Sequence, residues 1–187
     1  MAPFKARRVP PPLAESSLQE LALHYVGKYA TTKAKLRSYL SRKLRERGWD
    51  GARGPDLEGI ANRFAELGYI DDAAYALGQS RSLSARGYGK KRVADRLRLA
   101  GVADDDSEDA FRAADGAAVG AALRFAERRR LGPFATEAPD RPRREKWIMA
   151  MVRAGHNFSL ARAISLMDPG QVIDPDELRG HARLIDD

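Results

Sequence analysis

The sequence predicts an all-α protein, an elongated array of three tandem three-helix repeats. Helix-length stretches carry apolar residues at intervals of three and four, the spacing of one helix face. Three of these stretches end at Gly48, Gly101 and Gly155, about fifty residues apart, and a fixed period of this length is typical of stacked helical repeats. No stretch shows the alternating pattern of a half-buried β-strand.

The domain organisation that follows is a basic tail, three repeats and a C-terminal tail. The first segment is expected to be disordered because it mixes cations with prolines and cannot form a core. The last segment is expected to hold a short helix. In this order the predicted segments are 1–16, 17–68, 69–116, 117–168 and 169–187.

The first two helices of repeat 1 follow directly from the pattern. An apolar stripe from Leu18 to Tyr29 predicts the first. Thr31 or Thr32 can cap the second helix at its N-terminus, because their hydroxyl groups accept hydrogen bonds from free amides. Gly48 suits a left-handed residue that ends this helix.

The remaining helices are predicted in the same way. The third helix of repeat 1 points Leu57 and Leu67 inward and stops at Gly68. Asp71 can cap the helix that opens repeat 2, and Pro175 can begin a last short helix. The helices of repeats 2 and 3 are expected over 72–85, 89–100, 105–115, 117–131, 142–154 and 158–167.

Composition narrows the class of function. The 187 residues have a formal net charge of +7, densest in residues 1–50, which favours an acidic partner such as nucleic acid. The absence of cysteine excludes disulfides and thiolate metal sites and suits a reducing cytoplasm. No apolar run has the length of a membrane span. We therefore expect a cytoplasmic protein that does not contact membranes.

The segment Gly87-Tyr88-Gly89-Lys90-Lys91-Arg92 has two interpretations that the sequence leaves open. Backbone amides at a helix start and three adjacent cations could hold a phosphate. Alternatively, the segment is an ordinary joint between helices with solvated charges, since it lacks the spacing of a P-loop and no strand precedes it.

No catalytic or metal site is predicted. Asp71 and Asp72 are interpreted as helix-capping residues, because neighbours at a helix start do not face one another. His24, His156 and His181 lack ligand spacing, and we expect them at the surface or half-buried. We therefore predict no catalytic residue, no metal and no cofactor.

Cations recur at related places in the repeats. Stacking puts equivalent positions side by side, so this recurrence predicts a basic stripe that contacts a partner or nucleic acid. The candidate contact residues are Lys35, Arg42, Lys43, Arg86, Lys90, Lys91, Arg92, Arg96, Arg128 and Arg129.

One combination of motifs resembles a known family. The run Gly68-Tyr69-Ile70-Asp71-Asp72, with Tyr75 after it and then Gly87-Tyr88-Gly89, resembles the central signature of the RecX family of regulatory proteins. The resemblance covers about residues 18–168. In the third repeat this family tends to have Arg-Gly-Phe where this chain has Ala154-Gly155-His156. The structural signature residues would be Gly68, Tyr69, Ile70, Asp71, Asp72, Tyr75, Gly87 and Gly89.

The resemblance implies a non-enzymatic regulator that binds the RecA recombinase and lies in the groove of its filament on DNA. Such a protein would inhibit the ATPase, strand-exchange and coprotease activities of RecA and modulate recombination, DNA repair and the SOS response. We expect its direct contact with DNA to be weak and non-specific and the chain to be monomeric. Two alternatives remain: a helix-turn-helix transcription regulator built on segments such as 33–67, and a hydrolase that uses Asp71 and Asp72.

Overall fold

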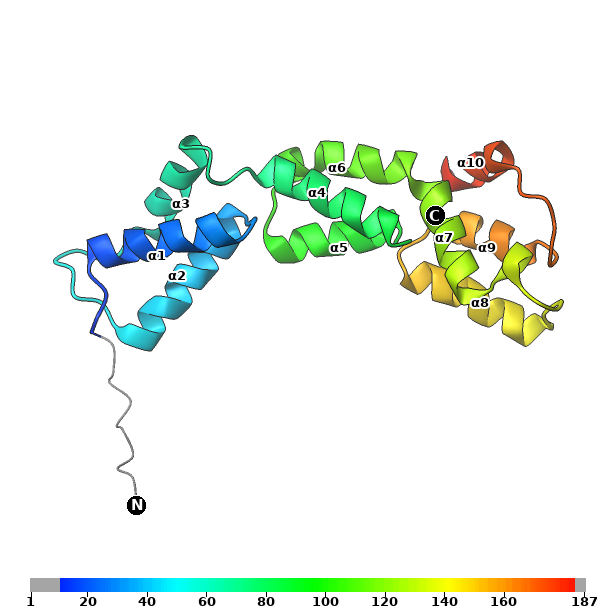
Figure 1. The fold of residues 1–187 in the computed structure, drawn as a ribbon, viewed down its shortest axis with the longest axis horizontal. Helices are drawn as coiled ribbons and strands as arrows, with labels where there is room; N and C mark the ends of the chain where they lie inside the picture. Colours follow the sequence, from blue (N-terminus) through cyan, green and yellow to red (C-terminus); the bar gives the residue numbers. More distant parts are fainter. Residues whose placement is uncertain (1–10, 184–187) are drawn as a thin grey trace, which may run out of the picture. The chain divides into compact units, whose positions relative to one another are not determined.

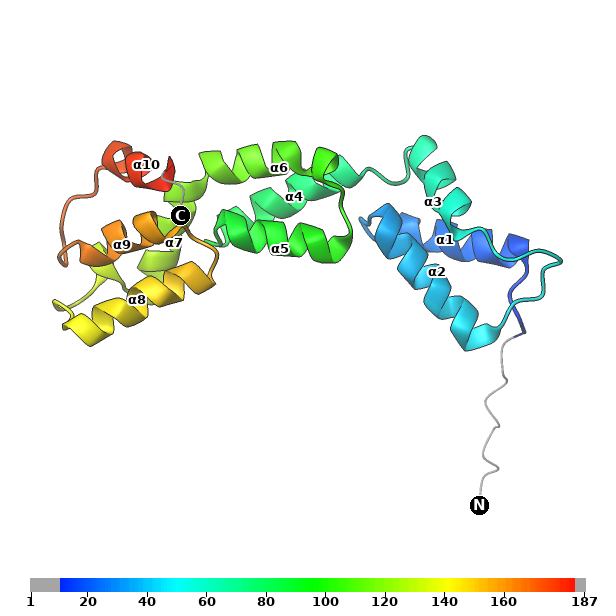
Figure 2. The ribbon, with the colours of Figure 1, turned by 180° about the vertical axis from the view of Figure 1, so that it is seen from behind.

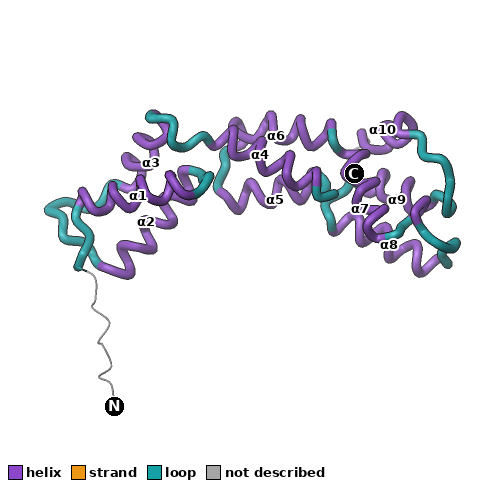
Figure 3. The backbone as a smooth tube through the Cα atoms, in the orientation of Figure 1, coloured by secondary structure: helices purple, strands orange, loops and turns teal. Residues whose placement is uncertain are grey.

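The computed structural model describes residues 11–183, which form ten α-helices and one 3-10 turn with no strand (Figures 1 and 3). The predicted all-α class is therefore confirmed for this part of the chain. The elements are α1 Glu15–Lys28, α2 Lys33–Arg47, α3 Leu57–Glu66, α4 Asp72–Ala85, α5 Lys90–Ala100, α6 Asp104–Gly116, α7 Ala118–Arg129, η1 Gly132–Phe134, α8 Arg141–Arg153, α9 Phe158–Leu166 and α10 Pro175–Arg183.

The chain divides into two compact units between Asp72 and Ala73. The first unit contains α1 to α3, and the second contains almost all of α4 and the helices up to α10. The division into three repeats stays a prediction.

In the first unit, α1 and α3 both pack on α2. Thr32 caps α2, since its hydroxyl group accepts a hydrogen bond from the Lys35 amide at 3.1 Å. Gly48 follows the helix with φ of 81° and ψ of 176°, so it has positive φ but not the left-handed helical conformation that we predicted. The buried core consists of Leu13, Leu18, Ala22, Leu36, Leu40, Ile60, Ala61, Phe64 and Ile70.

Residues 11–16 correct our prediction of a disordered tail over 1–16. Leu13 is fully buried in the core of the first unit. Its amide donates to the Gly48 carbonyl at 3.0 Å, and its carbonyl accepts from the Asp50 amide at 2.9 Å. Because the backbone of Leu13 is paired and its side chain is buried, this segment is ordered, and α1 begins at Glu15. The rest of the predicted tail lies outside the described residues.

The second unit comprises two groups of helices, α4 to α6 and α7 to α10 (Figure 2). Each group has an apolar core, and Tyr88 packs against both cores. One core lies among α4, α5 and α6 and includes Val93 and Leu97. The other lies among α7, α8, α9 and α10 and includes Trp147. Helix α10 packs on α7 and α9 and buries Leu178 there. Tyr88 therefore joins two groups of helices within one compact unit.

Asp72 is both the last residue of the first unit and the first residue of α4. Its carboxylate accepts a hydrogen bond at 3.0 Å from the amide of Lys33, the first residue of α2. Amides in the first turn of a helix have no partner within that helix, so this contact caps α2 from a distant point in the sequence. Asp71 immediately precedes the first residue of α4, the position that we predicted for it.

Candidate partner and nucleic-acid interface

The segment from Gly87 to Arg92 is a tight joint between α4 and α5 that packs on the turn between α8 and α9. The amide of Gly89 donates to the Ala154 carbonyl at 3.0 Å, and the amide of Lys91 donates to the Gly155 carbonyl at 3.1 Å. A Cβ atom added to Gly89 would lie 2.1 Å from the oxygen of Gly155. Two turns therefore meet backbone to backbone, and a side chain at Gly89 would prevent this contact.

Backbone hydrogen bonds also occupy most of the amides in this segment that could hold a phosphate. The Gly87 amide donates to the Ser84 carbonyl at 2.9 Å, and the Tyr88 amide donates to the Leu83 carbonyl at 3.0 Å. The amides of Gly89 and Lys91 are used by the neighbouring turn. A phosphate needs amides that point at it without another acceptor. The geometry supports the interpretation of this segment as a helix joint.

His156 completes the contact between the two turns. It is only 5% exposed, which corrects our expectation that it lies at the surface or is half-buried; His24 is exposed and His181 is half-buried. Its Nε2 lies 3.1 Å from the Gly87 carbonyl oxygen, which can only accept, so Nε2 carries the hydrogen. The ring contacts Phe125 edge-on at 5.6 Å. Burial lowers the pKa of His156 to about 4, although the bond to Gly87 opposes this shift.

Three arginines surround the joint. The guanidinium groups of Arg86 and Arg92 lie 6.0 and 5.8 Å from the centre of the Tyr88 ring. Arg128 on α7 donates a hydrogen bond to the Arg86 carbonyl at 2.8 Å. The residue that follows Arg128 on α7, Arg129, is exposed. None of these arginines forms an ion pair within residues 11–183. We call Arg86, Tyr88, Arg92 and Arg128 the Tyr88 patch.

The other predicted cations of α5 do not join this patch. Lys90 forms an ion pair of 2.7 Å with Asp115, the residue before the end of α6. Arg96 donates to the Gln79 side chain of α4 at 3.4 Å. Lys91 is exposed. The three consecutive cations at positions 90–92 therefore differ in their surroundings, although the sequence suggested one cluster.

The predicted cations of the first unit all lie on α2, and two of them share a carboxylate. Arg42 and Lys43 pair with Glu46 at 3.9 and 2.7 Å. The hydrogen bond from Lys43, together with nearby positive charge, lowers the pKa of Glu46. Both cations also lie near the Tyr39 ring, at 5.6 and 6.0 Å from its centre, while Lys35 is half-buried. The positive charge of Arg42 and Lys43 is therefore partly compensated on the helix itself.

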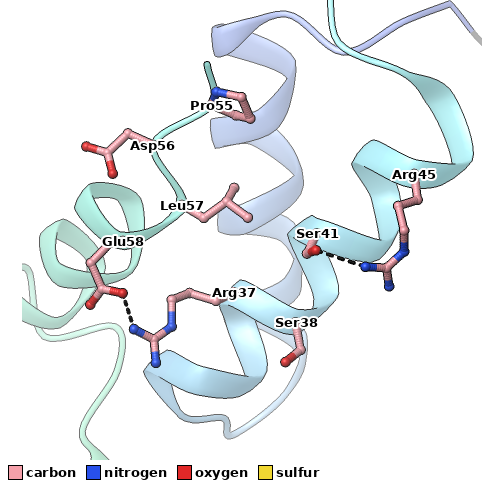
Figure 4. Close-up of a pocket in the computed structure, with 8 residues that line it drawn as sticks. All are labelled: Arg37, Ser38, Ser41, Arg45, Pro55, Asp56, Leu57 and Glu58. Atoms are coloured by element: carbon pink, nitrogen blue, oxygen red, sulfur yellow. Dashed lines mark hydrogen bonds and ion pairs between the residues drawn. The ribbon is translucent and has the colours of Figure 1, made fainter.

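A pocket of about 580 Å³ lies between α2 and the start of α3 (Figure 4). Arg37 forms an ion pair with Glu58 across it. Arg45 donates to the Ser41 hydroxyl group at 3.1 Å. The charged groups on its two arginines thus already have protein partners, so we assign no ligand to this pocket.

A second hollow, of about 820 Å³, lies between α1 and α3 and was not predicted. We expected Leu67 to point inward, but it is 51% exposed at the edge of this hollow. Leu23 on α1 and Tyr69 after α3 are exposed to a similar degree. The available signal was Leu23, an apolar residue that falls off the predicted stripe of α1.

The signature residues do not form one site. Gly68 has φ of 77° and makes the turn after α3, where Tyr69 is exposed. Ile70 lies in the core of the first unit, and Tyr75 is buried on α4. Together with the glycines of the α4–α5 joint, these residues set the backbone path and the packing rather than a reactive centre.

The described residues contain neither a metal cluster nor a membrane span. Within residues 11–183, no three histidine or carboxylate side chains are grouped so that they could hold a metal ion. None of the helices in this range has the length and apolarity needed to cross a bilayer.

Comparisons with known proteins identify the family. No family model matches the chain. Regulatory protein RecX of Myxococcus xanthus (strain DK1622) is 32% identical over 180 residues, which cover 89% of this chain and 91% of that protein. Regulatory protein RecX of Agrobacterium fabrum (strain C58) is 30% identical over 156 residues, covering 82% and 84%.

Solved structures agree in fold. The crystal structure of RecX from Lactobacillus salivarius matches with a TM-score of 0.58 at 21% identity, covering 80% of this chain and 92% of that one. A second crystal structure of regulatory protein RecX gives the same TM-score of 0.58 at 22% identity, covering 80% and 72%. With relatives at this identity over most of its length, the chain belongs to the RecX family of regulatory proteins.

Proposed function

We propose that this chain is a non-enzymatic regulator that binds the RecA recombinase and its filament on DNA. It inhibits the ATPase, strand-exchange and coprotease activities of RecA and thereby modulates recombination, DNA repair and the SOS response. It acts as a monomer in the cytoplasm, with weak and non-specific direct contact to DNA. The observation that carries the proposal is the 32% identity to a regulatory protein RecX across 89% of the chain.

The Tyr88 patch supports a contact with the nucleic acid of such a filament. Arg86, Arg92 and Arg128 have no carboxylate partner within residues 11–183, so an external anion would not have to displace an internal ion pair. Guanidinium groups match phosphate geometry well. The joint below them is fixed by backbone hydrogen bonds, which limits the entropy lost on binding. This arrangement suits a non-specific contact with the phosphate backbone.

A filament also explains why no single deep site is needed. Contacts that are weak alone add up when one chain carries several of them, because each bound contact raises the effective concentration of the next. A fragment that ends at Leu131 lacks α8 to α10 and should inhibit RecA much less than the full chain. Full inhibition by this fragment would remove the argument from several linked contacts.

The helix-turn-helix alternative has less support. The connection between α2 and α3 runs over residues 48–56, longer than the three or four residues of that motif. The turn at residues 86–89 has a suitable length, but the start of α5 packs on the α8–α9 turn. In a helix-turn-helix protein, the start of the second helix contacts the bases. In this chain the Lys91 amide is bonded to Gly155 instead.

The hydrolase alternative is also poorly supported. Asp72 is 7% exposed, and its carboxylate caps α2 through the Lys33 amide. A general acid or base has to reach substrate. A folded Asp72→Asn variant that retains inhibition of RecA would exclude a catalytic role for this carboxylate.

The decisive experiment is steady-state ATP hydrolysis by RecA on single-stranded DNA while this protein is titrated in. We expect inhibition below one copy per RecA, because a chain bound along or at the end of a filament affects several subunits. A chain that leaves ATP hydrolysis unchanged up to equimolar amounts, yet shifts a short duplex in a gel, would contradict the proposal. That result would favour the transcription regulator.

A further inference from the structure

The hollow between α1 and α3 is a groove with an apolar interior. Ile60 and Phe64 form its floor and are almost completely buried. Leu23, Leu67 and Tyr69 line its sides and are 50%, 51% and 54% exposed. The centres of the Tyr69 and Phe64 rings are 5.6 Å apart, so the Tyr69 ring packs beside the buried Phe64. Contiguous apolar side chains with this much exposure are typical of an interaction surface.

The packing of the first unit explains the groove. Helices α1 and α3 both pack on α2, and the groove follows the line between them. On α1 it extends from Glu15 to Leu23, which is about two helical turns. A groove of this kind accommodates the apolar face of a short amphipathic helix.

Most charges at the rim are negative, unlike those of the chain as a whole. Glu15 and Glu20 on α1 and Asp56 before α3 line the groove. Arg63 also lines it but pairs with Glu66 at 3.4 Å. In a chain of net charge +7, this rim repels a phosphate backbone and attracts cations. The groove therefore differs in both polarity and charge from the Tyr88 patch.

We infer that the groove between α1 and α3 binds a cationic amphipathic helix of a protein partner. Leu23, Leu67 and Tyr69 cover the apolar face of that helix, and the carboxylates of Glu15 and Glu20 face its lysines or arginines. The naming of RecA as this partner rests on the proposed function. The groove is then the protein-binding surface, whereas the Tyr88 patch faces nucleic acid.

The chemistry of the groove can be tested without RecA. The probe is a fluorescent peptide of about four helical turns with leucines at i, i+3, i+4 and i+7 and lysines elsewhere, compared with a peptide in which glutamates replace the lysines. Fluorescence anisotropy with the full chain should show binding of the lysine peptide only. Leu67→Lys and Glu20→Lys should each weaken this binding about tenfold or more.

Matched controls change exposed residues of the same types outside the groove. Leu99→Lys replaces an apolar side chain that is 83% exposed on α5, and Glu108→Lys reverses an exposed charge on α6. Both should bind the lysine peptide as the unchanged protein does. Circular dichroism verifies that all four variants remain helical. Equal binding by all variants, or equal binding of the glutamate peptide, would overturn the inference.

The same variants then distinguish this inference from the proposed function. Binding to RecA without DNA should fall about tenfold for Leu67→Lys and Glu20→Lys, while binding to single-stranded DNA without RecA should not fall. If RecA binds all variants equally, the groove inference is wrong and the proposed function stands. If no variant and not even the unchanged chain binds RecA, the proposed function is wrong, and loss of peptide binding in the groove variants still supports a cationic helix from another protein.

A second copy of this chain is the competing occupant. Light scattering over a range of concentrations would detect a dimer. A dimer that Leu67→Lys abolishes and Leu99→Lys retains would show that the groove serves self-association, which would overturn the inference.

Discussion

Two connections between helices, one in each compact unit, are stabilised in different ways. The α4–α5 turn, residues 86–89, is short and presses its backbone against another turn, with Gly89 facing Gly155. The α2–α3 loop, residues 48–56, is longer and is held by the Trp49 indole, whose Nε1 donates to the Arg53 carbonyl at 2.6 Å.

Gly89 in the first connection and Gly54 in the second have different surroundings. No atom lies within 4 Å of a Cβ added to Gly54 in the loop, whereas one added to Gly89 meets backbone atoms. A backbone contact thus restricts the residue type at Gly89, whereas Gly54 is free to change. Gly51 in the same loop is not, because a Cβ atom there would collide with the Trp49 ring. The presence of a glycine alone does not distinguish these cases.

Gly89→Ala should have the largest effect. Its Cβ atom would lie 2.1 Å from the Gly155 oxygen and 2.5 Å from the His156 nitrogen, and neither backbone atom can rotate away. We expect a loss of about 3 kcal/mol in the unfolding free energy of the second unit. Urea unfolding in a Trp49→Phe background, where Trp147 reports on that unit, measures it. A stable Gly89→Ala protein with an unchanged midpoint would disprove the close contact.

The His156→Phe variant tests the pH dependence of the same joint. Because the pKa of His156 is about 4 in the folded protein and its ordinary value is 6.5, the unfolded chain takes up the proton first as pH falls. The unchanged protein should therefore lose about 2 kcal/mol of stability between about pH 7.5 and pH 5 through this residue.

Unfolding free energies of both proteins at the two pH values give the comparison. His156→Phe lacks the proton-linked loss but also lacks the hydrogen bond to Gly87, so it should be relatively better at the lower pH. The contributions of all other titratable groups to stability are the same in both proteins and cancel in the difference. A difference that does not change with pH would show that His156 is not buried as a neutral ring.

Replacing the two arginines over Tyr88 should have a moderate effect on binding. In the Arg86→Ala, Arg92→Ala variant we expect about tenfold weaker binding to a RecA filament and a salt-dependence slope reduced by about one to two. The control is Arg42→Ala, Lys43→Ala, because both cations already share Glu46. If the control weakens binding as strongly, α2 rather than the Tyr88 patch faces the nucleic acid.

Gly54→Ala should have the smallest effect. The added methyl group meets no atom within 4 Å, and Gly54 is not among the glycines with positive φ. We expect a change in unfolding free energy within about 0.5 kcal/mol, or a slight gain, because alanine restricts the unfolded chain. Thermal unfolding followed by circular dichroism measures this change. A loss as large as that of Gly89→Ala would remove the distinction between the two connections.

The helices were predictable because their determinants are local. Apolar periodicity and capping residues placed α4 at 72–85, as found, and α9 at 158–167, close to the observed Phe158–Leu166. Thr32 also caps α2 as one of the two predicted candidates. These features depend on residues within a few positions of one another.

The N-terminal segment and the candidate site were less predictable because their determinants are distant in sequence. Leu13 is a single apolar residue among prolines, and only its pairing with Gly48 and Asp50 shows that it is buried. The burial of His156 depends on Gly87, far away along the chain. Repetition indicated which cations recur, but not which of them find a carboxylate after folding.

The carboxylate of Asp72 has a consequence for dissecting the protein by limited proteolysis. A cut after Gly68, the boundary that the repeat pattern suggests, would remove both the buried Ile70 and the acceptor for the Lys33 amide. A fragment that continues to Asp72 keeps both. A protease-resistant N-terminal core should therefore end beyond Asp72, several residues into what the sequence presents as the next repeat.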